Sequence, residues 1–151
     1  SIHWQVIVLI AALIPLGIVI ESSGTAAYIA NSMINYVDTY TPTVKPYVLF
    51  ALIYFVTMIM TEVSSNTATA IIMTPIVIAI TGEMQLDSRP FIFAVCFAAS
   101  ASFSTPVGYQ TNLMVYGPGG YRFSDYIKVG VPLAVTFWLL AILLIPLIWP
   151  F

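Results

Sequence analysis

Charged residues are scarce in this sequence, and the shortage excludes an ordinary water-soluble domain. Only 7% of the residues are Asp, Glu, Lys or Arg, whereas 60% are hydrophobic and the mean hydropathy is +1.00. A soluble domain carries about 25% charged residues. Because only helices and closed barrels satisfy their backbone in lipid, and the apolar runs have helical length, we expect an all-α integral membrane protein with several passes.

Cysteine and histidine are almost absent. Cys96 is the single cysteine, so no disulfide can form within the sequence. His3 is the single histidine, which argues against a histidine-based metal site. The formal net charge of -2 and the lack of a basic run predict no nucleic-acid partner. No set of residues resembles a catalytic triad, so we expect no enzymatic activity.

Apolar sequence begins almost at once, without the charged n-region or the cleavage site of a signal peptide. We therefore expect a fragment, or one half of a larger protein. The segment of about 4–21 predicts a first transmembrane helix, which Pro15 and Gly17 kink or locally unwind. Residues 23–38 place apolar side chains at three- and four-residue spacing. We expect an amphipathic helix along the membrane surface there, with a connecting helix of the soluble kind as the alternative.

A polar block at 61–67 interrupts membrane-grade sequence on both sides. Irregular polar backbone at membrane depth is tolerated only where it is buried in protein or lines a cavity. We therefore predict a re-entrant helical hairpin over 46–81 with its tip at 64–67. The alternative is a short loop between two spanning helices, with Ser and Thr as caps. The second arm, 68–80, is worth about 20 Å against a hydrocarbon core of about 30 Å, which favours re-entry.

A second polar interruption follows in the next apolar run. Residues 90–118 predict a broken transmembrane helix with its break at 104–112. Beyond it, we expect an interfacial helix at 123–129 and a transmembrane helix at 130–149.

Together the two interruptions have the chemistry of an ion site. Broken helices expose main-chain carbonyls, and hydroxyl and amide oxygens add to them, which gives the hard, neutral oxygens that suit sodium. Helix N-termini that point to the same place supply N–H donors for an anion. Two breaks facing each other would hold a cation and an anion side by side. This favours a transporter over a purely structural role.

The same residues carry a resemblance to a known family. Ser65-Asn66-Thr67, preceded by Thr61-Glu62, resembles the Ser-Asn-Thr signature of the divalent anion/sodium symporter family, within the larger ion transporter superfamily. Thr105-Pro106 with Asn112 resembles the second unwound segment of that family. These pieces come in the family's order and cover nearly the whole chain, but they match only the C-terminal half of a family member.

The resemblance implies the C-terminal inverted repeat of an elevator-type transporter, which works as a homodimer and needs a second hairpin from the missing N-terminal half. We therefore expect that these 151 residues alone do not transport. It also implies one sodium ion bound by the tip and the second break, with the anion between them. The implied sodium ligands are Thr61, Ser64, Asn66 and Ser104. The implied substrate ligands are Ser65, Asn66, Thr67, Thr105, Pro106, Thr111 and Asn112.

The second break departs from the dicarboxylate carriers of the family, which typically carry Thr-Pro-Pro-Asn. Here Val107 follows Thr105-Pro106, and the asparagine comes only at position 112. This version resembles the permeases that carry regulatory domains between their halves and are often assigned to sulfate or other inorganic anions. We therefore favour a sulfate-like anion over a C4 dicarboxylate.

The resulting prediction is sodium-coupled transport of a divalent anion across the cell (inner) membrane, in contact with the lipid bilayer. Two alternatives stay open at this point. A sodium/proton antiporter or an arsenite-type efflux permease of the same superfamily would depend on Glu62, since an acidic residue inside a membrane is a functional hypothesis by default. A membrane assembly subunit would not transport, and sodium would not stabilise it.

Overall fold

The structure, a computed structural model, describes residues 22–151 and the separate positions 8, 11, 15, 18 and 19. Apart from those five positions, the predicted transmembrane helix at about 4–21 lies outside the described residues. Every regular element within 22–151 is a helix, as the all-α prediction requires. The helices are α2 (Thr25–Val37), α3 (Lys45–Thr61), α4 (Asn66–Glu83), α5 (Ser88–Ala99), α6 (Gln110–Tyr116) and α7 (Phe123–Ile148).

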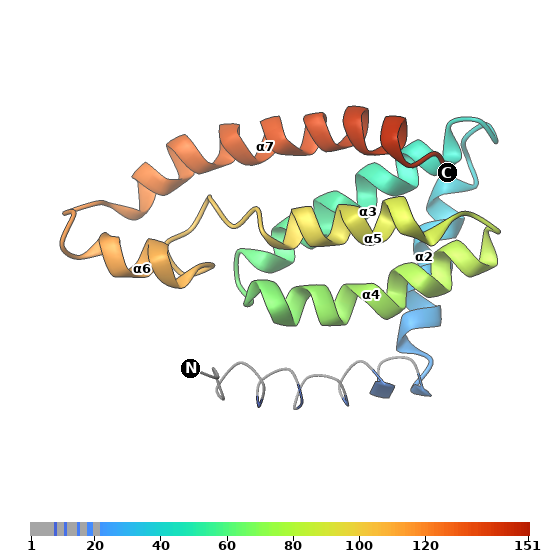
Figure 1. The fold of residues 1–151 in the computed structure, drawn as a ribbon, viewed down its shortest axis with the longest axis horizontal. Coiled ribbons are helices and arrows are strands. Elements are labelled where there is room, and N and C mark those ends of the chain that lie inside the picture. Colours follow the sequence, from blue (N-terminus) through green and yellow to red (C-terminus); the bar gives the residue numbers. More distant parts are fainter. Residues whose placement is uncertain (1–7, 9–10, 12–14, 16–17, 20–21) are drawn as a thin grey trace.

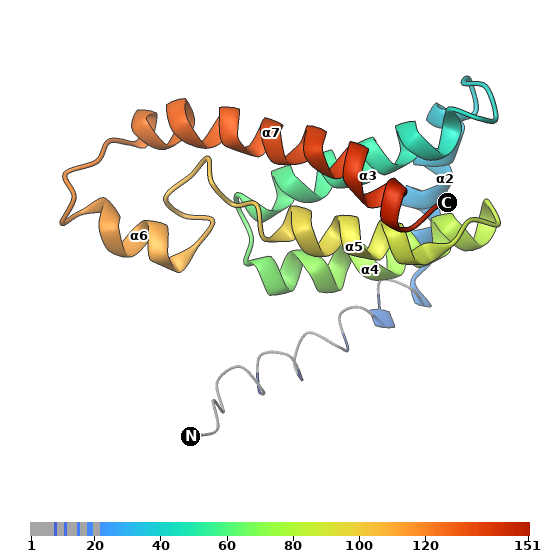
Figure 2. The ribbon, with the colours of Figure 1, turned by 45° about the horizontal axis from the view of Figure 1, so that its top comes forward.

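Helices α3, α4 and α5 run side by side and form the centre of the bundle (Figure 1). Helix α7 lies along α3 and α5, and α2 crosses the bundle at the end away from the α3–α4 turn. Helix α6 stands beside the bundle near the start of α7, in both views (Figures 1 and 2). The polar turn between α3 and α4 and the irregular segment after α5 therefore lie at the same end of the bundle.

The core is built where these three helices meet. Phe50 and Ile53 of α3 and Val77 of α4 are fully buried. Helix α5 contributes Ala94 and Ala98, which are also fully buried. Such small side chains let the backbones of neighbouring helices approach closely.

Helix α2 confirms the predicted helical spacing over 23–38. Its buried face consists of Ala26, Ala30, Met33 and Val37, and this face packs on α4 and α3. The apolar side chains for which we expected contact with the membrane surface thus pack against other helices of the protein. The location of α2 relative to a membrane stays a prediction.

Helix α4 is longer than the sequence interpretation allowed. It has 18 residues, because the helix continues through Thr81, Gly82 and Glu83. The buried Thr81 hydroxyl donates to the Val77 carbonyl at 2.9 Å, which satisfies the polar group inside the helix. At about 27 Å, α4 is long and apolar enough to be a candidate span, as is α7. The shortfall argument for re-entry therefore does not hold, and the re-entrant path stays a prediction.

The second interruption is present, but it begins earlier than predicted. Helix α5 ends at Ala99 and α6 starts at Gln110, so the irregular stretch covers 100–109 rather than 104–112. Beyond it the structure joins the segments predicted at 123–129 and 130–149 into one continuous helix of 26 residues, α7. The helix continues through Gly130, and at this residue it packs closely against the backbone of Phe103 and Ser104.

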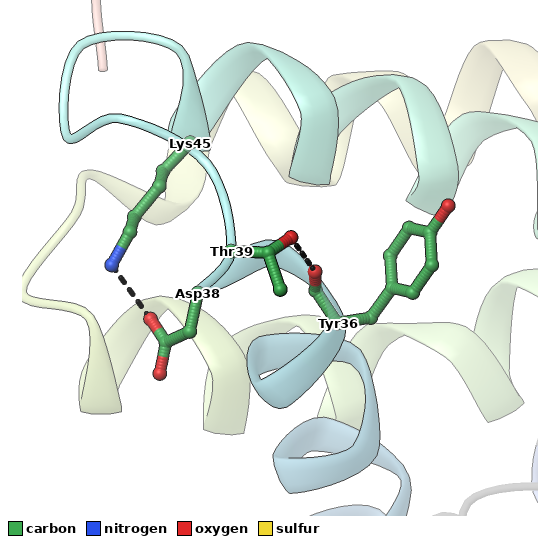
Figure 3. A network of polar contacts seen from close by, with 4 residues as sticks. All are labelled: Tyr36, Asp38, Thr39 and Lys45. Carbon is green, nitrogen blue, oxygen red and sulfur yellow. Dashed lines mark hydrogen bonds and ion pairs between the residues drawn. The ribbon is translucent and has the colours of Figure 1, made fainter.

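The turn between α2 and α3 is closed by an ion pair. Lys45 Nζ lies 2.7 Å from Asp38 Oδ1, and the Thr39 hydroxyl donates to the Tyr36 carbonyl at 3.0 Å (Figure 3). Lys45 is the first residue of α3, so its ammonium group lies at the opposite end of that helix from the polar turn.

Candidate functional site

The turn between α3 and α4, here called the tip (61–67), contacts the irregular segment 100–109, here called the break. The Thr61 hydroxyl donates to the Ala99 carbonyl at 2.6 Å. The Thr105 hydroxyl donates to the Glu62 carbonyl at 2.9 Å, and the Ser104 N–H donates to Glu62 Oε1 at 2.8 Å. The expectation that the two polar interruptions face each other is therefore confirmed for the described residues.

The approach of these two segments depends on a glycine. A Cβ atom at Gly108 would collide with the Ser102 hydroxyl and would lie 3.0 Å from the Thr61 carbonyl oxygen. Ser102 is itself buried, and its hydroxyl donates to that same carbonyl at 3.3 Å. The backbone of the break thus packs directly against the tip at Gly108, where there is no side chain to keep the two segments apart.

Thr61 and Asn66 form the oxygen-rich centre of the tip. The Thr61 hydroxyl lies 2.9 Å from Asn66 Oδ1 as well as 2.6 Å from the Ala99 carbonyl. A hydroxyl has one proton, so it can donate fully to only one of these two acceptors at a time. Three oxygens that share one proton are therefore gathered at one place. Such an arrangement suits a hard cation, which takes oxygen ligands.

The start of α4 presents donors instead of acceptors. Ser65 is the N-cap, and its hydroxyl oxygen accepts the Ala68 N–H at 3.2 Å, which leaves the hydroxyl proton for another partner. Asn66 and Thr67 lie in the first turn, where backbone N–H groups have no acceptor within the helix. Ser65 and Thr67 are exposed. Together with the positive end of the helix dipole, these groups favour an anion.

Two predicted substrate residues, Thr105 of the break and Asn112 of α6, have a different role in the structure. Asn112 Nδ2 donates to the Ser102 carbonyl at 3.0 Å and to the Thr105 carbonyl at 3.1 Å, which uses both of its N–H groups. The Thr105 hydroxyl donates to Glu62 and accepts the Gly108 N–H at 3.1 Å. Neither side chain has a spare donor for an anion in this arrangement. Both hold the break in shape.

The remaining predicted residues are more loosely placed. Pro106 is buried in the break, and Thr111 is exposed on α6. In the part of the chain that the structure describes, no hydrogen bond connects the side chain of Ser64 or Thr111 to the other predicted ligands.

Helix α7 holds the break from the other side, through residues that the sequence interpretation missed. A Cβ atom at Gly130 would collide with the backbone of Phe103 and Ser104. The Tyr126 hydroxyl donates to the Asn112 carbonyl at 2.9 Å. A glycine inside an apolar helix is a usable sequence signal for close packing. Nothing in the sequence predicts the hydrogen bond that the Tyr126 hydroxyl donates.

A cavity of about 450 Å³ opens between α6 and α7 beside the break. Asn112 is the one predicted substrate residue that lines it, and Phe103, Tyr126 and Gly130 are among its other walls. The lining of the cavity is mainly apolar, and no residue of the tip belongs to it. The cavity lies next to the proposed ion site and does not contain it.

Comparison with known proteins decides the family. Two overlapping segments of the chain, residues 1–98 and 63–151, match the family model described as citrate transporter. The chain belongs to this citrate transporter family. An uncharacterized transporter of Synechocystis sp. is 45% identical over 99% of this chain, and an uncharacterized transporter of Escherichia coli is 34% identical over 100% of it. Sodium/sulfate cotransporter 1 of Chlamydomonas reinhardtii is 34% identical over 94% of the chain.

This member of the family spans only part of its relatives. The matched region is 24% of the Synechocystis and Escherichia coli proteins and 16% of the Chlamydomonas protein. The resemblance to sodium-coupled anion transporters is confirmed at the level of the family, because sodium/sulfate cotransporters are among the relatives. The family also implies an integral membrane protein.

Proposed function

We propose that the intact protein carrying this chain transports a divalent, sulfate-like anion across the membrane, coupled to sodium. The observation that carries the proposal is the junction of the tip and the break, where two polar interruptions of apolar helices bond directly through Glu62, Ser104 and Thr105. Polar, irregular backbone of this kind near membrane depth is typical of transporter binding sites. The 34% identity to a protein named sodium/sulfate cotransporter 1 supports the same function.

The cation in this proposal is sodium, as a transported partner of the anion. The residues present suit it, because Thr61 and Asn66 gather oxygens that share one proton at the tip. Ser64 and Ser104 are proposed to add further oxygens. Neutral hydroxyl, amide and carbonyl oxygens are ligands that hard alkali and alkaline-earth cations accept.

The anion is proposed to bind at the start of α4. Ser65, Asn66 and Thr67 offer a free hydroxyl proton, an amide and the first N–H groups of the helix. Lys45 is paired with Asp38 at the far end of α3, and Arg89 lies at the far end of α5. Neutral donors and the charge of the sodium ion are proposed to hold the anion. A compact anion with oxygens on all sides, such as sulfate, suits such donors.

The finer architecture belongs to the same proposal. It comprises a re-entrant hairpin, an inverted repeat completed by an N-terminal half, a homodimer, and an elevator-type movement. A dicarboxylate stays the second substrate class; the matching family model is described as citrate transporter, and citrate is a tricarboxylate. Proton coupling through Glu62 is the second candidate mechanism, because its Oε2 atom is buried without a hydrogen-bond partner in the described part of the chain.

Uptake by the intact protein in proteoliposomes tests the proposal. Labelled sulfate should enter in an inward sodium gradient and not when potassium or choline replaces sodium. Unlabelled sulfate should compete at low concentration, and succinate and citrate should compete weakly. Uptake that needs a proton gradient and ignores sodium would reject the sodium coupling. Strong competition by succinate, with none by sulfate, would reject the inorganic anion.

A further inference from the structure

Two buried side-chain oxygens lack a hydrogen-bond partner in the described residues, and both belong to the tip region. They are Glu62 Oε2 and Thr69 Oγ1. Buried polar atoms almost always have a partner in native proteins, so each exception calls for a physical explanation. Glu62 immediately follows α3, and Thr69 lies in the first turn and a half of α4. Both residues thus lie at or beside the turn between α3 and α4.

Thr69 differs from several other threonines inside the helices. Thr57, Thr74 and Thr81 each donate their hydroxyl to the carbonyl four residues earlier, at 2.7, 2.6 and 2.9 Å. The equivalent acceptor for Thr69 is the Ser65 carbonyl, which is in place because it accepts the Thr69 N–H at 2.9 Å. The Thr69 hydroxyl nevertheless makes no such bond, although the residue is fully buried. The Thr69 hydroxyl is therefore available to a partner other than the helix backbone.

Thr69 lies three residues after Asn66, so the two residues share one face of α4. Asn66 contacts Thr61, and Glu62 is the next residue along the chain. The two residues with unpartnered oxygens are thus neighbours of this pair along the chain, Glu62 directly after Thr61 and Thr69 one helical turn after Asn66.

Glu62 also has no counter-ion among the residues that the structure describes. Its Oε1 accepts the Ser104 N–H, and Oε2 has no partner. In the described part of the chain the ion pair found is that of Lys45 with Asp38, which lies at the other end of α3. Buried charges in proteins are paired or coordinate metal ions. A cation at Oε2 would meet this requirement.

We propose that Glu62 and Thr69 complete a cation site at the tip, together with Thr61 and Asn66, and that Glu62 gives this site a negative charge. The proposal rests on the proposed function in taking sodium as the cation. It adds a buried hydroxyl and a carboxylate oxygen to the neutral ligands expected from the sequence. Such a site would bind sodium without leaving an uncompensated charge in a buried place.

Thermal unfolding of the purified intact protein over a range of sodium concentrations tests this site, with choline keeping the ionic strength constant and no anion substrate added. Sodium should raise the unfolding temperature of the wild-type protein, because a ligand that binds only the folded state stabilises it. Thr69→Val and Glu62→Gln should each raise the sodium concentration that gives half of this stabilisation by about tenfold or more, as expected for the loss of one good oxygen ligand.

Matched variants separate this effect from a general loss of stability. Thr57→Val removes a buried hydroxyl that already has an acceptor, so its sodium dependence should equal that of the wild type. Thr69→Ser keeps the hydroxyl and should retain the sodium response. Without sodium, Thr69→Val should unfold at or above the wild-type temperature, since it removes a polar atom that had no partner.

A wild-type sodium response in either Thr69→Val or Glu62→Gln overturns the proposal while leaving sodium coupling intact. A wild-type protein that sodium does not stabilise overturns both this site and the sodium part of the proposed function. The two failures are therefore distinguishable in one experiment.

Discussion

At the scale of single residues, Asn66 is the side chain on which the proposed cation and anion sites overlap. Its Oδ1 lies beside the Thr61 hydroxyl, and its backbone N–H belongs to the first turn of α4. Asn66→Ala should remove one sodium ligand and raise the sodium concentration for half-maximal uptake by about tenfold. Sodium titration of sulfate uptake measures this value. A sodium dependence identical to that of the wild type would remove Asn66 from the cation site.

Thr67 and Thr105 give a second prediction, because the two hydroxyls have opposite surroundings. Thr67 is exposed and makes no hydrogen bond within the described residues. Thr67→Val keeps the shape and loses one donor, so the anion KM should rise about three- to tenfold with unchanged expression and unfolding temperature.

Thr105→Val is the matched change in the break. It takes away the partner of the Gly108 N–H and of the Glu62 carbonyl, so it should lower stability by about 1–3 kcal/mol. Uptake kinetics and thermal unfolding of the two variants separate the roles. An unaltered anion KM in Thr67→Val would contradict its place in the site, and an unaltered stability in Thr105→Val would contradict the structural role of that hydroxyl.

The residue types at the site could be predicted from the sequence, but which of their N–H and O–H groups already have an acceptor could not. Polar residues inside apolar runs are visible in the sequence, and Thr61, Asn66, Ser104 and Thr105 do come together. Whether a particular N–H or O–H is free depends on backbone carbonyls brought in from elsewhere in the chain. Asn112 therefore suggested a substrate ligand, whereas the structure uses both of its N–H groups to hold the break.

At the scale of helices, the junction depends on how closely α7 approaches the break. Gly130 is buried in α7, and a Cβ there would collide with the backbone of Phe103 and Ser104. Backbone atoms cannot move aside as a flexible side chain can, so Gly130→Ala should destabilise the protein by about 1–3 kcal/mol. It should also weaken uptake, because Ser104 shifts relative to Glu62. Thermal unfolding and sulfate uptake measure the two effects.

Gly82→Ala is the control for this prediction. Gly82 also lies in a helix, α4, but a Cβ there would meet nothing within 4 Å. Alanine favours the helix over glycine by up to about 1 kcal/mol, so this variant should be as stable as the wild type or slightly more. Equal stability of Gly130→Ala and Gly82→Ala would show that the contact of α7 with the break is looser than the structure places it.

Helix boundaries mark the limit of sequence reasoning at this scale. The spacing in α2 was sufficient, because small and apolar residues recur every three or four positions. The sequence predicts that Thr81-Gly82-Glu83 ends the apolar run, whereas α4 continues through these residues, and the Thr81 hydroxyl bonds back to Val77 within the helix. The break starts earlier than predicted although the alanines within 98–102 favour a helix by intrinsic propensity. Hydrogen bonds with the tip form at this place instead, and the sequence alone does not show them.

At the scale of the whole molecule, the tip and the break are proposed to supply only one side of a binding site. The exposed surface of α7 is apolar along its length, with Leu133, Phe137, Leu140 and Leu144 between 40% and 51% exposed. An apolar surface of this extent needs lipid or further protein to cover it. The part that matches this chain is only 24% of the Synechocystis and Escherichia coli relatives, so most of each relative lies outside the match. These observations support the expectation that other segments contribute to the transport site.

The last prediction follows from this incompleteness. The 151-residue chain, reconstituted alone, should show no sodium-driven sulfate uptake above that of empty liposomes, because the implied site needs a second hairpin and this sequence contains only one Ser-Asn-Thr segment, at 65–67. The intact protein, reconstituted in parallel, should take up sulfate in a sodium gradient. Circular dichroism of the isolated chain should first establish that it is helical, so that inactivity does not merely report unfolding. Uptake by the isolated chain at the rate of the intact protein would mean that one hairpin and one break suffice, and that the two-hairpin site is wrong for this protein.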